Sequence, residues 1–204
     1  MGPLPPGALV QVWGPSGAGK TSLLLTLLRR GDCFVDGEGL VPGRFQRVVG
    51  ERGRGVLVGR PADFEQVLGS LRKSARLLAE RRVERVLVDG ALHAWRFERL
   101  GARADLAHLL AALQALRAAA RSTGGRVLLT NQATAGPGPL PRPAGGLGLQ
   151  HLSDVLVRLE PLEPPWVRLA LDKHPTRASG GVWEGRLQEG LLLPVSLSHP
   201  VHQV

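Results

Sequence analysis

The chain has 204 residues, of which 43% are hydrophobic and 21% charged, with one cysteine and a formal net charge of +9. These values exclude a disordered chain, a disulfide scaffold and a cysteine-rich zinc finger, and no apolar run reaches the roughly 18 residues that a membrane-spanning helix needs. A basic domain favours nucleic acid as a partner, but 23 Arg against three Lys is also typical of a GC-rich genome such as that of a thermophile, so charge alone leaves this partner open.

Strands and helices are predicted to alternate along the first two thirds of the chain. Short apolar runs such as RVLVDG at 85–90 suit central parallel strands that are buried on both faces. Helices are indicated where apolar residues recur at i, i+3, i+4 and i+7, as in Phe64, Val67, Leu68 and Leu71. The predicted elements, in chain order, are a strand at 8–13, a helix over 22–31, strands at 33–39 and 56–59, a helix that starts at Asp63, a strand at 85–90, a helix that includes 106–116 and ends at Gly124, and a strand at 126–132.

The last third of the chain has a different pattern. Residues 133–148 are rich in proline and glycine, which predicts a loop without helix or strand, and loops of that length in compact domains are usually functional or mobile. Residues 154–160 and 166–172 alternate apolar and polar side chains around PLEPP, so we expect a hairpin. A last strand is predicted around 182–187.

Alternating β and α units followed by a hairpin predict an α/β fold with a mostly parallel sheet, flanking helices and an antiparallel C-terminal extension. We expect one domain over 1–204, with short tails at 1–7 and 193–204. The composition and the lack of a membrane span lead us to expect a soluble, cytoplasmic protein.

A phosphate-binding motif lies between the first strand and the first helix, and it matches G-x-x-x-x-G-K-[ST] in full. Its backbone N–H groups would surround the phosphates of ATP, aided by the positive end of the helix dipole. Lys20 would reach the β- and γ-phosphates, and the Thr21 hydroxyl would bind Mg²⁺. The alternative is a chance glycine-rich turn. The residues predicted to bind nucleotide are Gly14, Pro15, Ser16, Gly17, Ala18, Gly19, Lys20, Thr21 and Ser22.

A second magnesium ligand is predicted at Asp89, which ends the buried strand at 85–90. Ligands of α/β proteins bind at the carboxyl ends of parallel strands, so this carboxylate would face the same crevice as Thr21. The alternative is an Asp that caps the segment after the strand.

The order of several segments resembles that of the RecA/RadA-type recombinases. FVDGEG at 34–39 resembles their Y-x-D-x-E-G, and LLTNQ at 128–132 resembles their strand that ends in T-N-Q. GGLGLQHLSDVLVRLE at 145–160 is similar to the stretch that closes their second DNA-binding loop. LDKHPTRASGG at 171–181 resembles a segment of the archaeal RadB group in particular. The resemblance covers roughly 8–192 and implies a RecA-like P-loop NTPase.

The resemblance also implies catalytic roles. Glu38 matches the glutamate that activates the attacking water, and an acid at the carboxyl end of a strand suits that role. Gln132 matches the glutamine that senses the γ-phosphate, and together with Lys20 these residues form the expected catalytic set. The alternative is that Glu38 and Asp36 are solvated turn residues.

Lys173, Arg177 and His151 match residues that lie at the nucleotide of a neighbouring subunit. A cation supplied in trans would stabilise charge on the transferring phosphoryl group and link hydrolysis to assembly through head-to-tail contacts. The alternatives are an exposed loop with ordinary cations and a structural histidine.

The family places two loops over DNA, which correspond here to 97–104 and 133–148. The first follows Trp95 and carries basic residues interleaved with aromatic ones, a pattern that suits single-stranded DNA. Trp95 and Phe97 could equally belong to the core. The residues predicted to contact DNA are Arg96, Arg99, Arg103 and Arg142.

Some residues depart from the family pattern. Gly37 and Gly90 replace the usual Ser or Thr beside the strand-end acids, and the N-terminal polymerisation segment of full recombinases is not found before Ala8. We therefore expect an accessory factor in DNA repair and homologous recombination: a slow, Mg-dependent and DNA-dependent ATPase with a recombinase or another repair protein as partner. The alternatives are a nucleotide-gated mediator that does not hydrolyse ATP, a clock-type RecA-core ATPase that acts on proteins, and a small-molecule kinase.

Overall fold

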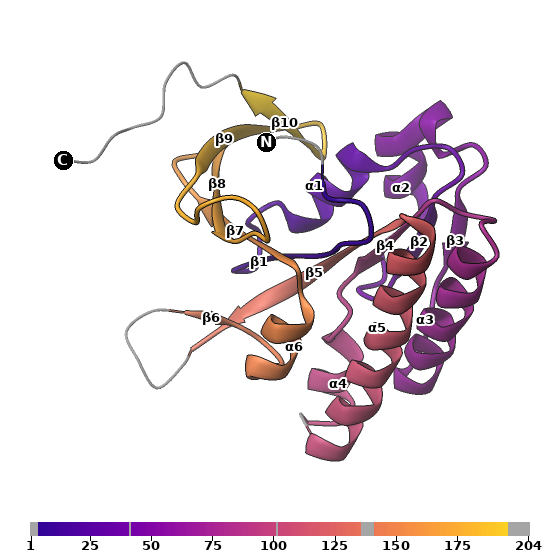
Figure 1. The fold of residues 1–204 in the computed structure, drawn as a ribbon. Helices are drawn as coiled ribbons and strands as arrows, with labels where there is room; N and C mark the ends of the chain where they lie inside the picture. Colours follow the sequence, from indigo (N-terminus) through magenta and orange to yellow (C-terminus); the bar gives the residue numbers. More distant parts are fainter. Residues whose placement is uncertain (1–3, 41, 101, 136–140, 196–204) are drawn as a thin grey trace.

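The computed structural model describes residues 4–40, 42–100, 102–135 and 141–195 (Figure 1). The helices cover both faces of one twisted sheet. The strands are β1 (Leu9–Gly14), β2 (Cys33–Asp36), β3 (Leu57–Gly59), β4 (Arg85–Asp89), β5 (Arg126–Thr134), β6 (Arg142–Pro143), β7 (Val155–Pro161), β8 (Trp166–Lys173), β9 (Val182–Gln188) and β10 (Leu191–Val195). The helices are α1 (Lys20–Leu27), α2 (Pro42–Val49), α3 (Phe64–Ala79), α4 (His93–Phe97), α5 (Arg103–Thr123) and α6 (Gly146–Leu152), with a 3-10 turn at Gly50–Gly53.

The sheet has the strand order β10-β9-β8-β7-β1-β5-β4-β2-β3, and β6 pairs with β5 outside this path. Strands β3, β2, β4, β5, β1 and β7 are parallel to one another, whereas β7, β8, β9 and β10 form an antiparallel extension. The expected hairpin is therefore present as β7 and β8. The parallel strands all end at the same edge, which brings the residues after β1, β2, β4 and β5 together.

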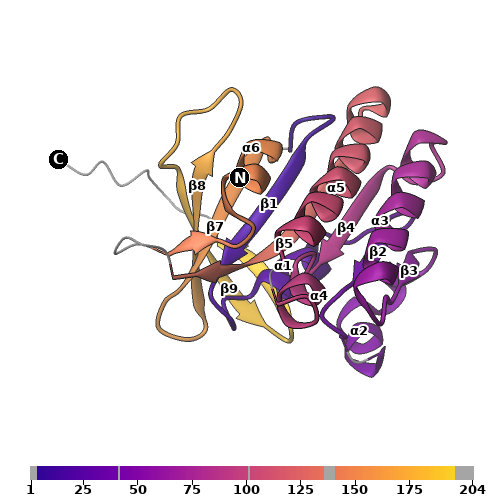
Figure 2. The same ribbon diagram turned by 90° about the horizontal axis from the view of Figure 1, so that it is seen from below.

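Two apolar clusters lie on opposite faces of the sheet, and adjacent residues of one strand belong to different clusters. In β4, Val86 and Val88 face α3 and α5, which lie side by side in Figure 2, whereas Leu87 faces α1. This burial on both faces confirms the interpretation of 85–90 as a central parallel strand. On the α1 face, the curled extension returns over the helix, and the amide of Leu192 in β10 donates to Thr26 Oγ1 at 2.9 Å.

The segment 133–148, expected to be a loop, contains regular structure at both ends. Strand β5 continues to Thr134, β6 pairs with it antiparallel, and α6 begins at Gly146. The Asn131 side chain donates to the carbonyl of Ala144 at 2.8 Å, and Leu149 is buried in the core. These contacts stabilise regular structure in the segment, and they cannot be predicted from its proline and glycine content. Residues 136–140 lie outside the described part of the chain.

The ends of other predicted elements also differ. Helix α1 stops at Leu27 rather than Gly31, because Leu28 is extended. Residues 193–195, expected in a tail, belong to β10, where Pro194 is accommodated on an edge strand. Residues 4–7 are anchored rather than free, since Gly7 donates to the carbonyl of Gly125 at 2.8 Å. Residues 1–3 and 196–204 lie outside the described part. Helices α2 and α4 were not predicted. None of the described helices has the length and apolar content needed to cross a membrane.

Candidate functional site

The predicted phosphate loop runs from the end of β1 into α1, and its glycines permit its shape. Gly17 and Gly19 have φ values of +77° and +86°, in the left-handed region that favours glycine. At Gly14, a Cβ would lie only 2.4 Å from the carbonyl oxygen of Leu159. No side chain caps the first turn of α1, so its amide groups remain available to an anion.

Lys20 lies at the centre of the loop and is 6% exposed. Its ammonium donates to the carbonyls of Gly14 at 3.1 Å and Pro15 at 2.7 Å, and to Gln132 Oε1 at 3.2 Å. Burial lowers the pKa of Lys20, and the nearby carboxylates of Glu38 and Asp89 oppose this effect. A cation held by neutral oxygens in a buried site is suited to exchange them for phosphate oxygens, which are stronger acceptors.

Thr21 and Asp89 are brought into contact, as expected for a shared magnesium site. The Thr21 hydroxyl donates to Asp89 Oδ2 at 2.8 Å, and Thr130 Oγ1 donates to Oδ1 at 2.7 Å. Asp89 is only 1% exposed, and this burial raises its pKa to about 6, against the effect of the Thr130 and Thr21 hydrogen bonds. Thr130, which the sequence analysis did not single out, also accepts from the amide of Gly90 at 2.7 Å.

This pair of ligands fits Mg²⁺ as a companion of a nucleotide. Magnesium prefers oxygen ligands and is usually held by one or two carboxylates, with phosphates and waters completing its shell. Thr21 and Asp89 offer a hydroxyl and a buried carboxylate whose charged form is otherwise disfavoured. Within the described residues there is no group of three or more His, Cys, Asp or Glu that could hold a metal by themselves.

Gln132 connects Lys20 to Glu38. Its Nε2 donates to Glu38 Oε1 at 3.4 Å, while its own Oε1 accepts from Lys20. The three predicted catalytic residues, from the start of α1, the turn after β2 and the last part of β5, thus form one chain of contacts. Glu38 itself is exposed and Asp36 is buried, where it accepts from the amide of Leu40 at 2.9 Å. Asp36 therefore shapes the turn and is not a solvated side chain.

The two glycines that depart from the family pattern allow β2 and β4 to approach at this edge. A Cβ at Gly90 would lie 2.2 Å from Cγ of Glu38, and Gly90 has a φ of +65°. A Cβ at Gly37 would lie 2.9 Å from the carbonyl oxygen of Asp89. Larger residues at either position would displace Glu38 or separate the strand ends.

Comparisons with known proteins agree with this geometry. No protein-family model matches the chain. The DNA repair and recombination protein RadB of Thermococcus kodakarensis is 31% identical over 193 residues, which cover 86% of this chain and 84% of that protein. The chain belongs to the RadB family of RecA-like proteins. RadB of Methanococcoides burtonii is 29% identical over 195 residues, covering 87% of this chain and 85% of that protein.

The crystal structure of the RadB recombinase has the same fold, with a TM-score of 0.75 and 25% identity over 96% of this chain and 94% of that one. The expected resemblance to the RadB group and the expected α/β fold with an antiparallel extension are thereby confirmed.

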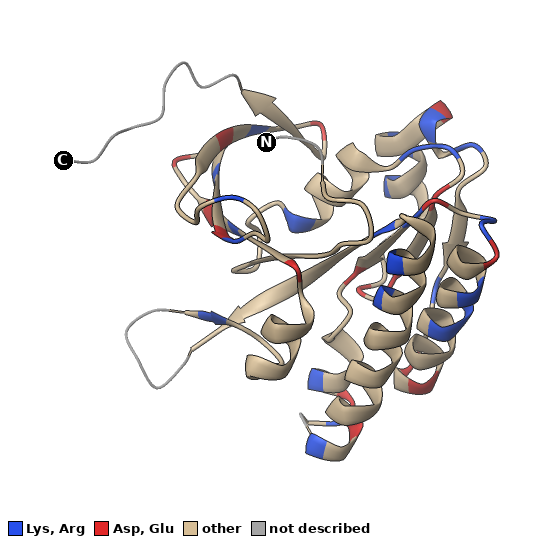
Figure 3. Cartoon of the chain, in the orientation of Figure 1, with Lys and Arg blue, Asp and Glu red and all other residues tan. Residues whose placement is uncertain are grey.

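Three of the four residues expected to contact DNA in this RadB-family chain lie on a helix or strand, and these elements carry blue segments in Figure 3. Arg96 is on α4, Arg103 is the first residue of α5 rather than part of a loop, and Arg142 is on β6. Arg99 lies between α4 and α5, where its guanidinium is 3.4 Å from Glu65 Oε1. Arg99, Arg103 and Arg142 are exposed, and Arg96 is half-buried.

Arg96 lines a cavity of about 340 Å³ between α4 and the β5–β6 hairpin, together with Trp95, Leu100 and Thr134. The cavity brings together parts of both predicted DNA loops. Trp95 is half-buried against the core and donates to the carbonyl of Ala102 at 2.8 Å, which fits the structural alternative for this residue. Phe97 is 64% exposed, so it does not belong to the core.

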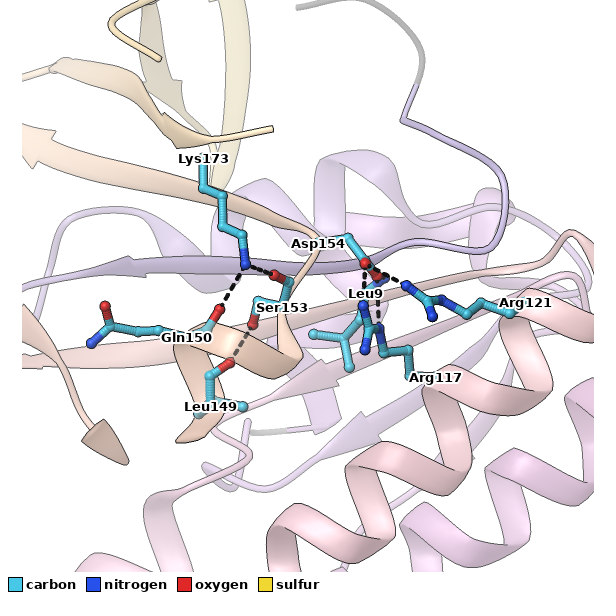
Figure 4. A network of polar contacts seen from close by, with 8 residues as sticks. All are labelled: Leu9, Arg117, Arg121, Leu149, Gln150, Ser153, Asp154 and Lys173. Carbon is cyan, nitrogen blue, oxygen red and sulfur yellow. Dashed lines mark hydrogen bonds and ion pairs between the residues drawn. The ribbon is translucent and has the colours of Figure 1, made fainter. Parts of the chain in front are cut away.

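Lys173, the predicted interface residue with hydrogen bonds inside the chain, contacts the end of α6 and not the phosphate loop. Figure 4 shows Lys173 pointing at the end of α6, where its ammonium donates to the carbonyls of Gln150 at 3.1 Å and Ser153 at 2.7 Å. Arg177 and His151 are exposed. Within one chain, Lys173 therefore stabilises the C-terminal end of a helix.

Figure 4 also shows a charge network that the sequence analysis missed. Asp154, just before β7, accepts from the amide of Leu9 at 2.9 Å, from Arg117 Nε at 3.0 Å and from Arg121 at 3.0 Å. Burial raises the pKa of Asp154, but the hydrogen bonds from Arg117 and Leu9 outweigh it and lower the pKa overall. One carboxylate thus connects β1, β7 and α5.

Proposed function

We propose that this protein binds ATP with Mg²⁺ at the edge where β1, β2, β4 and β5 end, and hydrolyses it slowly. The chain of contacts from Lys20 through Gln132 to Glu38, beside the Thr21–Asp89 pair, carries the proposal. The amides of the phosphate loop and Lys20 would bind the phosphates, and Thr21 and Asp89 would hold Mg²⁺, which neutralises phosphate charge when bound.

In this proposal Glu38 accepts the proton of the attacking water. The hydrogen bond that it accepts from Gln132 is 3.4 Å long, and its side chain is exposed on a turn. A base that is not held rigidly is less well oriented for in-line attack, which would limit the rate. Slow turnover is therefore the expectation for the chain on its own.

Binding of single-stranded DNA would be coupled to the nucleotide through β5. Gln132 lies in the same strand as Thr134, which pairs with Arg142 of β6. A rearrangement of Gln132 toward a γ-phosphate would therefore be transmitted to the hairpin that carries a predicted DNA contact. The cavity shared by Arg96 and Thr134 places the first predicted loop beside the same hairpin.

The biological role that we propose is that of an accessory factor in DNA repair and homologous recombination. The similar proteins from Thermococcus kodakarensis and Methanococcoides burtonii are both named DNA repair and recombination protein RadB. A recombinase or another repair protein would be the partner, and Lys173, Arg177 and His151 would reach a neighbouring nucleotide in a head-to-tail assembly. Lys173 would then have to leave the carbonyls of α6.

The test is ATP hydrolysis by the purified protein with and without an oligothymidine strand. We expect stimulation by DNA, and we expect Glu38→Gln to retain ATP binding but lose hydrolysis. Glu163→Gln, an exposed glutamate on the β7–β8 turn, is the matched control and should leave the rate unchanged. ATP binding without hydrolysis in the unmodified protein would overturn the enzymatic part of the proposal and favour a nucleotide-gated mediator.

A further inference from the structure

A second cavity lies at the opposite end of the parallel strands from the phosphate loop. It has a volume of about 800 Å³, within the range of small-ligand pockets. Asp32 comes just before β2, and Arg85 and Arg126 are the first residues of β4 and β5, so one wall is formed by the amino-terminal ends of these strands. The opposite wall comes from α1 and from the antiparallel extension.

The two walls differ in chemistry. The wall from α1, β8, β9 and β10 is mostly apolar, with Glu184 of β9 as its charged residue, and its large apolar side chains are Leu23, Leu27, Leu169, Trp183 and Leu192. The other wall and the rim carry six arginines, namely Arg29, Arg30, Arg81, Arg82, Arg85 and Arg126. In Figure 3 blue segments gather on the loops above β2 and β4, at the upper right of the sheet. The lining also includes three carboxylates, so the local balance of charge is positive.

Some of these arginines are fixed by the fold and others are free to bind a ligand. Arg85 donates to Asp32 Oδ1 at 2.9 Å and to the carbonyl of Leu27 at 2.9 Å, and Arg126 donates to the carbonyl of Leu4 at 2.9 Å. The guanidinium groups of Arg29 and Arg30 are exposed and have no hydrogen bond or ion pair with any of the described residues. Two unpaired cations therefore stand beside an apolar wall.

We infer that this cavity binds an acidic segment of a partner polypeptide that carries a bulky apolar side chain. The apolar side chain would pack between Leu27, Trp183 and Leu192, while its acidic neighbours would pair with Arg29 and Arg30. Buried apolar anchors surrounded by charge pairs are a common arrangement in peptide recognition. The inference does not depend on the nucleotide site, because the two lie at opposite ends of the strands.

A peptide is favoured over nucleic acid by the carboxylates in the lining. Glu84 and Glu184 would repel a phosphate backbone that runs through the cavity, whereas the charge of Asp32 is already paired with Arg85. In a peptide complex, carboxylate side chains can occupy the arginine side alone and leave Glu184, on β9, next to the apolar part of the ligand. Removal of the Glu184 charge should therefore strengthen binding of an acidic peptide.

The probe is a fluorescein-labelled hexapeptide with two central leucines and two glutamates on either side, titrated with the full-length protein in fluorescence anisotropy. We expect saturable binding that weakens with salt. The double variant Arg29→Glu/Arg30→Glu should bind at least about tenfold more weakly, since two cations that attract the acidic peptide become anions that repel it. Glu184→Gln should bind about twofold to fivefold more tightly.

Arg72→Glu/Arg76→Glu, on the exposed face of α3, is the matched control with the same change of charge. It should bind like the unmodified protein, and unchanged melting temperatures would show that all variants are folded. Equal loss in the control pair would overturn the inference, as would equal binding of a peptide with alanines in place of the leucines. Lack of binding at millimolar protein, or displacement by oligothymidine that depends on Arg29 and Arg30, would overturn it too.

Discussion

The charged side chains of the candidate nucleotide site are buried and hydrogen-bonded, whereas those of the surface predicted to contact DNA are mostly exposed. Lys20 is 6% exposed with three acceptors, and Asp89 is 1% exposed with two hydroxyl donors. Arg103 and Arg142 are exposed at the starts of α5 and β6. Buried charges must be positioned by the fold, because an unpaired one is costly, whereas exposed arginines can move to suit a ligand. Substitutions should therefore have large and specific effects in the first region and small, additive ones in the second.

The largest effect is expected at Lys20. Lys20→Ala should weaken ATP binding at least about 100-fold, because it removes charge-assisted hydrogen bonds to phosphate that contribute about 1.5–3 kcal/mol each. Titration with a fluorescent ATP analogue measures this loss. Lys73→Ala, which removes an exposed lysine on α3, is the control and should bind ATP normally. Similar affinities for the two variants would mean that the glycine-rich turn is not a phosphate site.

The next largest effect is expected at Asp154, where a substitution should change the stability of the fold but not the binding of nucleotide. Asp154→Asn should lower the free energy of unfolding by about 2 kcal/mol, or roughly 4–8 °C in melting temperature, yet leave ATP affinity unchanged. Asp105→Asn, in the first turn of α5, is the control and should change the melting temperature little. Because the pKa of Asp154 is lowered on folding, its stabilisation is present above the unfolded pKa and is lost as pH falls through the folded value. Equal melting temperatures for the two variants would contradict this role.

A smaller effect of the opposite sign is expected at Asp89. Its pKa is raised to about 6 in the fold, so the folded state binds more protons than the unfolded state between about pH 4 and 6. Stability is therefore lost as pH rises through about 6, and Asp89→Asn should stabilise the nucleotide-free protein by about 1 kcal/mol near pH 7.5. Melting temperatures of both proteins between pH 4.5 and 7.5 measure this gain. A gain that does not grow with pH would contradict the raised pKa.

The smallest effects are expected on the surface predicted to meet DNA. Arg96→Ala and Arg142→Ala should each weaken binding of single-stranded DNA about threefold, and each should reduce the slope of log affinity against log salt by about 0.7. Anisotropy of a labelled oligothymidine at several salt concentrations measures both quantities. Arg72→Ala, on the far side of α3, should leave the slope unchanged. If the slope is also unchanged in the Arg96 and Arg142 variants, these two residues do not belong to the proposed DNA surface.

The sequence predicted the parallel core well because each central strand is a short apolar run, and it predicted Lys20, Thr21 and Asp89 as neighbours because parallel strands end at one edge. Other elements depend on contacts between distant residues. The expected loop at 133–148 includes the first residues of α6, because the bond from Asn131 to the carbonyl of Ala144 is not visible in the composition of this segment. The amino-end cavity could not be predicted, since its arginines come from separate loops in a chain that is rich in arginine throughout.

The packing of the C-terminal strand β10 over α1 has a consequence for synthesis of the protein. The helix that begins at Lys20 packs beneath β10, and the amide of Leu192 bonds to Thr26 across 166 positions of the chain. Strand β1 likewise pairs with β5 and β7, whose residues are made much later. The glycine-rich loop therefore leaves the ribosome long before the strands that shape it. Pairing between such distant segments is slow, and the emerging chain holds an apolar strand and helix without partners until its final hairpin is complete.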